Sequence, residues 1–248
     1  MINFHITAAG RRLAYDHVAG HSPTIIFLCG FRSDMMGSKA AYLAAWAAEK
    51  TLDFLRFDYS GHGQSSGDFL DGCISDWVAD AADIIRARAK PAYTLVGSSM
   101  GGWIALLLAR QMPEKLAGLV GIAAAPDFTE DSMWDGFSGA QREELAKMGA
   151  VQIPSDYGDP YTITQKLIED GRENLVLRAP LHLPFPVRLL QGTADADVPV
   201  SVALRLMGHA SGDDIRLNLV KGADHRFSSP ACLKLVTQTI NDLPASLL

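Results

Sequence analysis

The chain has 248 residues, of which 48% are hydrophobic, and a formal net charge of −6 at pH 7. This acidic balance disfavours nucleic acid or an anionic membrane surface as a partner, and no apolar run reaches the roughly 18 residues that a membrane span needs. A chain of this length usually folds as a single unit that buries roughly three quarters of its unfolded surface. We therefore expect one globular domain over residues 1–248.

The N-terminal residues lead directly into a strand-like stretch, residues 3–7, so we expect no signal or transit segment. The three cysteines, Cys29, Cys73 and Cys232, are odd in number and lack the spacing of zinc ligands. We expect them to act as small core residues in a reducing compartment. The predicted location is the cytoplasm.

Strands and helices alternate along most of the chain, which is typical of a mostly parallel sheet with helices on both faces. Two N-terminal strands come first and six more follow. The predicted strands are 2–7, 12–18, 24–29, 52–57, 93–97, 117–122, 187–191 and 215–220. The predicted helices between and after them are 38–49, 74–89, 100–111, 200–208 and 230–242.

The most informative motif stands where the fifth strand turns into the third helix. Gly97-Ser98-Ser99-Met100-Gly101 follows a β-prone apolar run and precedes a strongly apolar helix. A Gly-x-Ser-x-Gly in this context is the nucleophile elbow, in which small residues let strand and helix approach while the serine takes a strained backbone conformation. Only Ser99 has glycine at both required positions, so Ser99 is the predicted nucleophile and Ser98 is expected to pack beneath it.

Residues 127–184 interrupt the alternation, after the sixth predicted strand, and are too long for an ordinary connection. We expect them to form a helical lid. Ser138 and Gln141 make a capping-box start for a helix that ends near Met148, and a second helix is predicted over 162–173. The apolar residues Met133, Trp134, Phe137 and Met148 either line an acyl pocket or pack the lid against the body.

Two later strands end in loops that carry candidate partners for Ser99. A serine hydroxyl needs a base, and that base needs an acid to orient it. Asp195 follows the strand at 187–191, and His225 follows the strand at 215–220. The order serine, acid, histidine is that of α/β-hydrolase triads, so His225 is the predicted base and Asp195 the predicted acid.

Two other carboxylates compete with Asp195. Asp197 stands directly before Val198-Pro199 and the next helix, where it could instead be a cap or turn residue. Asp127 follows the end of the sixth strand, which is another position from which an acid can reach the base. The sequence leaves both open.

The reaction also needs two donors for the oxyanion. The backbone N–H of Met100, directly after the nucleophile, is the first. The second is assigned to the backbone N–H of Phe31, in the loop after the strand at 24–29, where Gly30 lets the backbone come close to a substrate. A simple strand-to-helix turn is the alternative interpretation of that loop.

Ser99, Asp195 and His225 resemble the catalytic triad of the α/β-hydrolase superfamily, and 58–65 resembles its D-x-x-G-x-G-x-S loop. More narrowly, the chain is similar to the branch that contains the mitochondrial acyl-protein thioesterase, also known as mycophenolic acid acyl-glucuronide esterase. The similar segments are 30–40, 56–61, 96–103 and 224–226. The chain departs from this branch at Gln191, where relatives commonly have histidine before the glycine, and in having no transit peptide.

The resemblance implies a serine hydrolase that cleaves acyl thioesters, of the palmitoyl type, or esters through a covalent acyl-enzyme. Its substrate would be a small molecule or an acylated protein, and neither a metal nor an organic cofactor is implied. The alternatives are a small-metabolite carboxylesterase or C–C bond hydrolase, and a ligand-binding member of the fold without catalysis. The sequence does not fix the acyl group, the leaving group or the oligomeric state.

Overall fold

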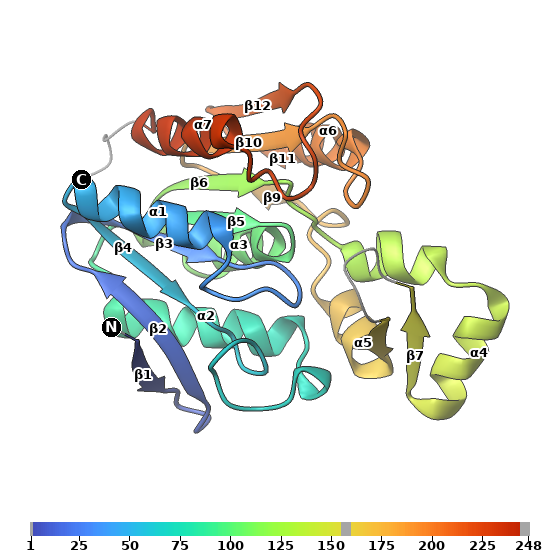
Figure 1. Ribbon diagram of the computed structural model, residues 1–248. Helices are drawn as coiled ribbons and strands as arrows, with labels where there is room; N and C mark the ends of the chain where they lie inside the picture. The colour runs from blue at the N-terminus through green and yellow to red at the C-terminus, as the bar shows by residue number, and fades with distance from the viewer. Residues whose placement is uncertain (1, 155–159, 244–248) are drawn as a thin grey trace.

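The fold is built around one eight-stranded sheet with helices packed on it (Figure 1). The computed structural model describes residues 2–154 and 160–243. The strand order is β1-β2-β4-β3-β5-β6-β10-β12. β2 is antiparallel to both neighbours, and the other strands are paired in parallel. The predicted mostly parallel eight-stranded sheet is therefore confirmed. Residues 155–159 of the predicted lid, and residues 1 and 244–248 of the predicted domain, lie outside the described residues.

The strands of the main sheet agree with the predicted ones to within a few residues. They are β1 (Asn3–Ile6), β2 (Arg12–Val18), β3 (His21–Leu28), β4 (Leu52–Phe57), β5 (Tyr93–Ser98), β6 (Leu116–Ile122), β10 (Val187–Gly192) and β12 (Ile215–Val220). Two short strands that the sequence analysis missed, β9 (Leu181–His182) and β11 (Ala210–Ser211), pair with each other.

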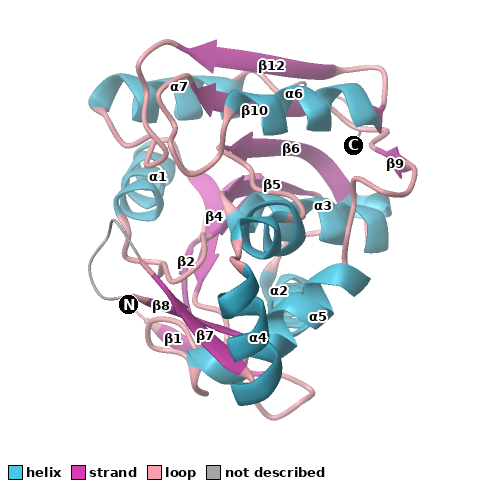
Figure 2. Ribbon diagram, turned by 90° about the vertical axis from the view of Figure 1, so that its right-hand side faces the viewer, coloured by secondary structure: helices cyan, strands magenta, loops and turns pink. Residues whose placement is uncertain are grey.

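The helices form two layers, one on each face of the sheet. They are α1 (Ser38–Glu49), α2 (Ile74–Arg88), α3 (Met100–Gln111), α6 (Val200–His209) and α7 (Pro230–Asn241). Figure 2 shows α1 and α7 on one face and α2, α3 and α6 on the other. Among the described residues, no helix has both the length and the apolar character to cross a membrane.

The central strands are buried because helices cover both of their faces. Every residue of β5 and of β10 is buried, and so is nearly all of α3, from Met100 to Ala109. Trp77 and Trp103 are the largest fully buried side chains. The thiols of Cys29, Cys73 and Cys232 are buried and free, as expected for core cysteines.

The insertion between β6 and β10 projects beside the body of the molecule (Figure 1). It contains a π-helical turn η3 (Thr129–Trp134), α4 (Gly139–Met148), the antiparallel pair β7 (Ala150–Ile153) and β8 (Tyr161–Thr164), and α5 (Gln165–Glu173). The predicted capping box of α4 is present, with Ser138 accepting from the Gln141 N–H and the Gln141 side chain accepting from the Ser138 N–H.

The second predicted helix of this insertion, over 162–173, is wrong in its first part. Residues Tyr161–Thr164 form strand β8, and α5 begins only at Gln165. The backbone of this segment pairs with β7, and the Thr164 side chain accepts a hydrogen bond from the Leu167 N–H as the helix cap. The insertion is therefore a mixed unit of helices and a hairpin rather than a purely helical one.

Candidate active site

Ser99 stands at a sharp turn between β5 and α3, and its backbone is in a strained region. Its φ of 55° and ψ of −120° place it at the N-cap of α3 with a conformation that residues other than glycine rarely adopt. Neighbouring elements hold it there, because the Ser99 N–H donates to the Ile122 carbonyl at 3.0 Å and the Ala125 N–H donates to the Ser99 carbonyl at 3.1 Å. This is the strained geometry that the elbow motif predicts.

The glycines of the motif allow the strand and the helix to approach one another. A Cβ at Gly97 would stand 2.3 Å from the Gly101 carbonyl oxygen, and a Cβ at Gly101 would stand 2.1 Å from the Leu28 carbonyl oxygen. No side chain larger than hydrogen fits at either position without moving backbone. The turn that exposes Ser99 therefore depends on these two residues.

The structure brings Ser99, His225 and Asp195 into one hydrogen-bonded chain. The Ser99 Oγ lies 3.1 Å from His225 Nε2, and His225 Nδ1 lies 2.9 Å from Asp195 Oδ2. Since an ionised carboxylate only accepts, the proton of neutral His225 is assigned to Nδ1, which leaves Nε2 to accept from the serine hydroxyl. This arrangement can withdraw a proton from Ser99.

The carboxylate of Asp195 is fully buried and accepts hydrogen bonds on both of its oxygens. Its Oδ1 accepts from the backbone N–H groups of Asp197 at 3.0 Å and Val198 at 2.8 Å. Burial alone would raise the pKa of Asp195, but donors that include His225, Val198 and Gln191 outweigh it and hold that pKa below its usual range. The charged form is the one that this site stabilises.

The two competing acids have other contacts. Asp127 is buried and accepts from the backbone N–H groups of Val176 and Leu177 and from the Arg178 guanidinium. Asp197 lines the cavity described below, and its backbone N–H supports Asp195. Of the three carboxylates that the sequence proposed, Asp195 is the one whose side chain is hydrogen-bonded to His225.

Asp195, Asp197 and His225 are also the group of described residues that could hold a metal ion, with ligand atoms within 4.8 Å of one another. Their lone pairs are largely engaged, however. Asp195 accepts four hydrogen bonds from its surroundings, and His225 Nε2 faces Ser99. The donor set suits proton transfer better than coordination of a cation.

The loop after β3 brings its backbone against the nucleophile. A Cβ at Gly30 would stand 3.3 Å from the Ser99 Cβ, so Gly30 and the adjoining Phe31 pass directly beside Ser99. Met100 is the first residue of α3, where the N–H groups have no partner within the helix. The two predicted oxyanion donors therefore belong to segments that meet at Ser99.

An aromatic cluster supports this loop. The Phe31 ring meets the rings of Phe69 and Trp77 edge to face, with centroids 4.9 and 6.2 Å apart. His62 packs against both of these rings. Burial lowers the pKa of His62 and favours its neutral form. His62 is thus a loop residue that packs beside the site.

Asp58 ties the D-x-x-G-x-G-x-S loop to the loop that contains Phe31. Its carboxylate accepts from the backbone N–H groups of Met35 at 2.7 Å and Gln64 at 2.9 Å. Gly63 has a positive φ, and a Cβ there would stand 2.1 Å from Asp58 Oδ2. The glycine is needed because the carboxylate occupies the space of a side chain.

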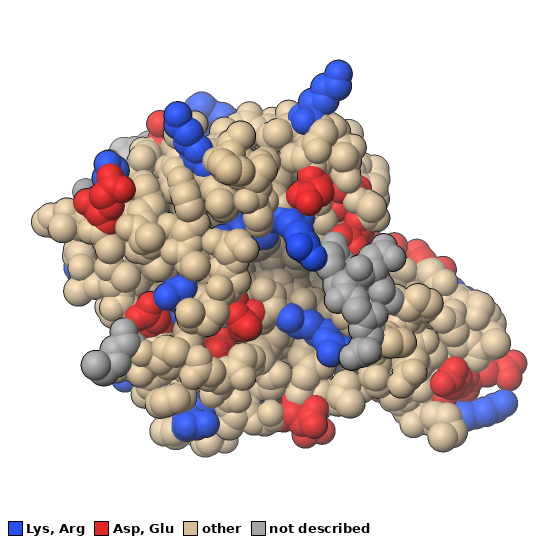
Figure 3. All heavy atoms as spheres, in the orientation of Figure 1, with Lys and Arg blue, Asp and Glu red and all other residues tan. Residues whose placement is uncertain are grey.

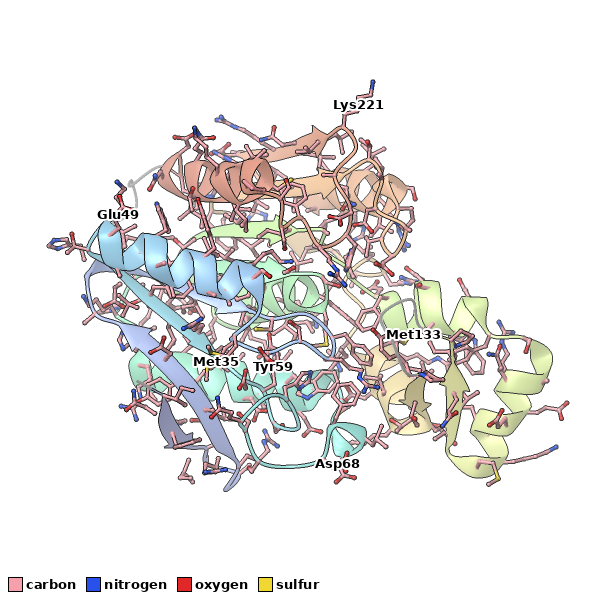
Figure 4. The ribbon with its side chains drawn as sticks, in the orientation of Figure 1. Met35, Glu49, Tyr59, Asp68, Met133 and Lys221 are labelled. Atoms are coloured by element: carbon pink, nitrogen blue, oxygen red, sulfur yellow. The ribbon has the colours of Figure 1, made fainter. Side chains whose placement is uncertain are left out.

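A cavity of about 820 Å³ opens over Ser99 and His225, and the surface is hollowed between the body and the insertion (Figure 3). Body and insertion both line it. Figure 4 labels Met133 in the insertion, next to the body of the molecule. Aromatic and aliphatic side chains form much of the wall: Phe31, Phe128, Met133, Phe137, Ile153 and Tyr161. A volume of this size suits a small organic ligand.

Two of the four predicted pocket residues line this cavity, namely Met133 and Phe137, and two do not. Trp134 lies instead with the guanidinium groups of Arg142 and Arg172 over its ring, at 4.8 and 4.4 Å. Met148 is 77% exposed at the end of α4. Trp134 therefore has the packing role that the sequence left open, and Met148 has neither role, because hydrophobic character alone does not tell which side of a short helix faces the cavity.

Several residues that line the cavity were not predicted from the sequence. Arg32 follows Phe31 with a φ of 54°, and its guanidinium lies over the rings of Phe69, in the body, and Tyr161, in the insertion. Phe128 lies directly after Asp127 at the start of the insertion and contacts Phe31. Proximity to Gly30 and to the start of the insertion was the signal available for Arg32 and Phe128.

Comparisons with known proteins agree with the fold and the site described above. Residues 21–156 match the family model described as serine aminopeptidase, S33. The rat protein named palmitoyl-protein thioesterase ABHD10, mitochondrial, is 34% identical over 233 residues, which are 93% of this chain and 78% of the rat protein.

Two solved structures are similar over almost their whole length. A putative hydrolase from Agrobacterium vitis is 40% identical with a TM-score of 0.93, covering 97% of this chain and 98% of that one. The alpha/beta hydrolase domain-containing protein 10 from mouse is 32% identical with a TM-score of 0.90, covering 98% of this chain and 97% of the mouse chain.

Proposed function

The chain belongs to the serine aminopeptidase, S33, family of α/β-hydrolases and is a hydrolase, and from this premise we propose that it cleaves acyl thioesters and activated esters through an acyl-enzyme on Ser99. The observation that carries the proposal is the hydrogen-bonded chain Ser99–His225–Asp195 at the floor of an acyl-sized cavity. The acyl preference draws on the thioesterase relatives.

In the acylation step, Ser99 Oγ attacks the acyl carbonyl carbon while its proton passes to His225 Nε2. Asp195 keeps the imidazole in the tautomer that can accept this proton and stabilises the imidazolium that forms. The carbonyl oxygen becomes an oxyanion, which the backbone N–H groups of Phe31 and Met100 stabilise. Collapse of the intermediate breaks the bond to the leaving group, which takes the proton from His225. Where the leaving group departs as an anion, His225 gives that proton to solvent before deacylation.

In the deacylation step, water enters and gives a proton to His225 Nε2 as its oxygen attacks the acyl carbon of the ester on Ser99. A second oxyanion forms and collapses. The proton returns from His225 to Ser99 Oγ, and a free carboxylic acid leaves. Both halves use the same base and the same donors, so the site needs no further catalytic group.

The substrate class follows from the cavity wall and from the relatives. An acyl chain that lies against Phe128, Met133 and Phe137 gains roughly 0.8 kcal/mol for each methylene buried. A thiolate leaving group needs little help from His225, so thioesters and activated esters are favoured over alkyl esters and amides. Thioesterase activity is named for the rat relative, and we extend it to this chain as part of the proposal.

The test is a set of p-nitrophenyl esters and acyl thioesters with acyl chains from acetyl to palmitoyl. We expect kcat/KM to rise with chain length until the cavity is filled, by up to about fourfold per methylene. Ser99→Ala should lower kcat by several orders of magnitude on each substrate.

Two results would favour the alternatives. A profile that peaks at acetyl would indicate a small-metabolite esterase. No turnover of any ester or thioester by the wild-type protein, with tight binding of an acyl ligand, would indicate a binding protein that keeps the fold.

Two further points belong to the proposal. We propose residues 127–184 as a lid on the single domain 1–248, because this insertion supplies one wall of the cavity.

The cytoplasm stays the predicted compartment on the basis of three buried free thiols, whereas the named relatives are mitochondrial. Microscopy of the full-length chain with a C-terminal fluorescent tag would decide between the two.

A further inference from the structure

Gln191 is a buried polar residue in β10 that lies directly beneath Asp195. It is 1% exposed, and its amide Nε2 donates to Asp195 Oδ2 at 2.9 Å and to the Val198 carbonyl at 2.9 Å. Asp195 Oδ2 is also the oxygen that accepts from His225 Nδ1. One side-chain N–H of Gln191 and the imidazole N–H of His225 therefore share a single carboxylate oxygen.

The surroundings fix the orientation of this amide. Three acceptors face the Gln191 nitrogen, the third being the Gly192 carbonyl at 3.3 Å. Turning the amide over would bring its oxygen against the carboxylate of Asp195 and the Val198 carbonyl, which is a contact between acceptors. The donor assignment thus follows from the partners.

The amide oxygen has a different environment. Among the described residues, Gln191 Oε1 is buried without a hydrogen-bond partner. A buried acceptor without a partner is unfavourable, so this position is not optimised for the amide as a whole. The hydrogen bond that this position does form with the triad is the one from Gln191 Nε2 to Asp195.

We propose that Gln191 is a positioning residue that fixes the Asp195 carboxylate toward His225. This inference rests on the proposed function, since it assigns Gln191 a role in the same triad. Backbone N–H groups hold Oδ1, and Gln191 holds Oδ2, the oxygen that also accepts from His225. With both oxygens held, the carboxylate cannot rotate about its χ2 bond away from the imidazole.

The same hydrogen bond affects the charge density on Asp195 Oδ2, the oxygen that accepts from His225. Donation from Gln191 draws electron density from Asp195 Oδ2, so its loss leaves a more basic carboxylate and stabilises the imidazolium. Among the described residues, the charged groups near His225 include Asp197, with a ligand atom within 4.8 Å, Asp224 and Arg226 in its own loop, and Lys39 of α1, which donates to the Arg226 carbonyl. None of these is altered by a change at Gln191, so a shift in the pH profile reports on Asp195.

The experiment compares three variants at this position with the wild type. Gln191→Met keeps the approximate volume but has no donor, Gln191→His keeps a side-chain N–H donor, and Gln191→Asn keeps an amide that is one methylene too short. The readouts are kcat and KM on one activated ester over a range of pH. The fraction of protein that excess fluorophosphonate labels on Ser99 at completion gives the concentration of folded sites.

The matched control is Thr24→Val. Thr24 is buried and donates to Oδ1 of the buried Asp53 at 2.7 Å, and that oxygen also contacts His17 Nε2 at 3.0 Å. This control removes a donor from a buried carboxylate that is paired with a histidine, as Gln191→Met does, but outside the site. It shows what loss of such a donor does to the fold alone.

We expect Gln191→Met to lower kcat about tenfold per folded site with little change in KM, and to move the acidic limb of kcat/KM to higher pH. Gln191→His should recover most of the rate, and Gln191→Asn should match the Met variant, which keeps the test valid if that variant does not fold. Thr24→Val should leave both kcat and the profile unchanged.

Wild-type kcat and an unmoved profile in Gln191→Met or Gln191→Asn would overturn the inference, and so would the same change in Thr24→Val. Those outcomes leave the proposed function intact. A wild-type protein that fluorophosphonate does not label on Ser99 would instead contradict the proposed function itself.

Discussion

At the scale of single residues, the neighbourhood of Asp195 separates two carboxylates that the sequence left in competition. Asp195 and Asp197 are two positions apart in a loop. The side chain of Asp195 accepts from His225, whereas Asp197 contributes its backbone N–H to Asp195. A contact between a loop and a histidine 30 residues later depends on the tertiary structure, so the local sequence could not choose between them.

Replacing Asp195 by asparagine should remove the charge but keep the shape. The histidine then loses the partner that fixes its tautomer, and kcat should fall by about 10⁴. Asp197→Asn keeps its backbone N–H and should lose far less activity. Steady-state kinetics on both variants check this, with circular dichroism to show that each is folded. A larger loss in Asp197→Asn would assign the acid to Asp197.

The residues that carry the motif were predictable because short local patterns determine them. Ser99 and His225 follow from their places after strands, and the glycines follow from the close approach of β5 and α3. The choice between a pocket role and a packing role for Trp134 was not predictable. Its position depends on Arg142 and Arg172, which reach it from two different helices.

At the scale of elements, the insertion begins and ends at one buried carboxylate. Asp127, at its start, accepts from Val176 and Leu177 at its end and from the guanidinium of Arg178 at 2.7 Å. Arg178 also pairs with Asp131, and this contact lowers the pKa of Asp131. The two ends of the insertion are thereby held side by side, next to the cavity.

Removing this carboxylate should destabilise the protein strongly. In Asp127→Ala two buried N–H groups lose their acceptor and the Arg178 guanidinium loses one of its two carboxylate partners, so we expect a loss of about 3 kcal/mol in the free energy of unfolding. Arg216→Ala, which breaks an ion pair with Asp214 at a side chain that is 70% exposed, should cost under about 1 kcal/mol.

Urea unfolding of both variants measures these values. Equal losses in the two variants would show that Asp127 does not hold the insertion. A loss in Asp127→Ala without any change in Arg216→Ala would agree with the structure.

The regular elements of the body were predictable to within a few residues, and the hairpin of the insertion was not. Long apolar strands and capped helices carry strong local patterns. Strands β7 and β8 have four residues each and become stable only by pairing with each other. The local pattern therefore predicts Thr162 and Ile163 as part of the helix that follows them.

At the scale of the whole molecule, the cavity combines a rigid floor with a wall from the insertion. Ser99 and His225 come from loops at the carboxyl ends of parallel strands, where open sheets build their sites. Phe137 reaches the same space from the insertion and is buried. The sequence predicted both parts, but the assignment of individual lining residues needed the packing of the two against each other.

Shortening Phe137 should therefore change selectivity more than basal activity. In Phe137→Ala we expect kcat/KM for long acyl chains to fall toward the value for acetyl, since the wall that buries the chain is lost. Met148→Ala, at a side chain that is 77% exposed, is the control and should keep the wild-type profile. A chain-length profile that is unchanged in Phe137→Ala would place the acyl chain elsewhere.

The central claim is that Ser99 forms a covalent bond with its substrate, and mass spectrometry of the intact protein tests it most directly. After treatment with a fluorophosphonate, the wild-type protein should gain one label, and peptide mapping should find it on Ser99. The Ser99→Ala variant should gain none. A label on Ser98, or undiminished labelling of Ser99→Ala, would contradict the account.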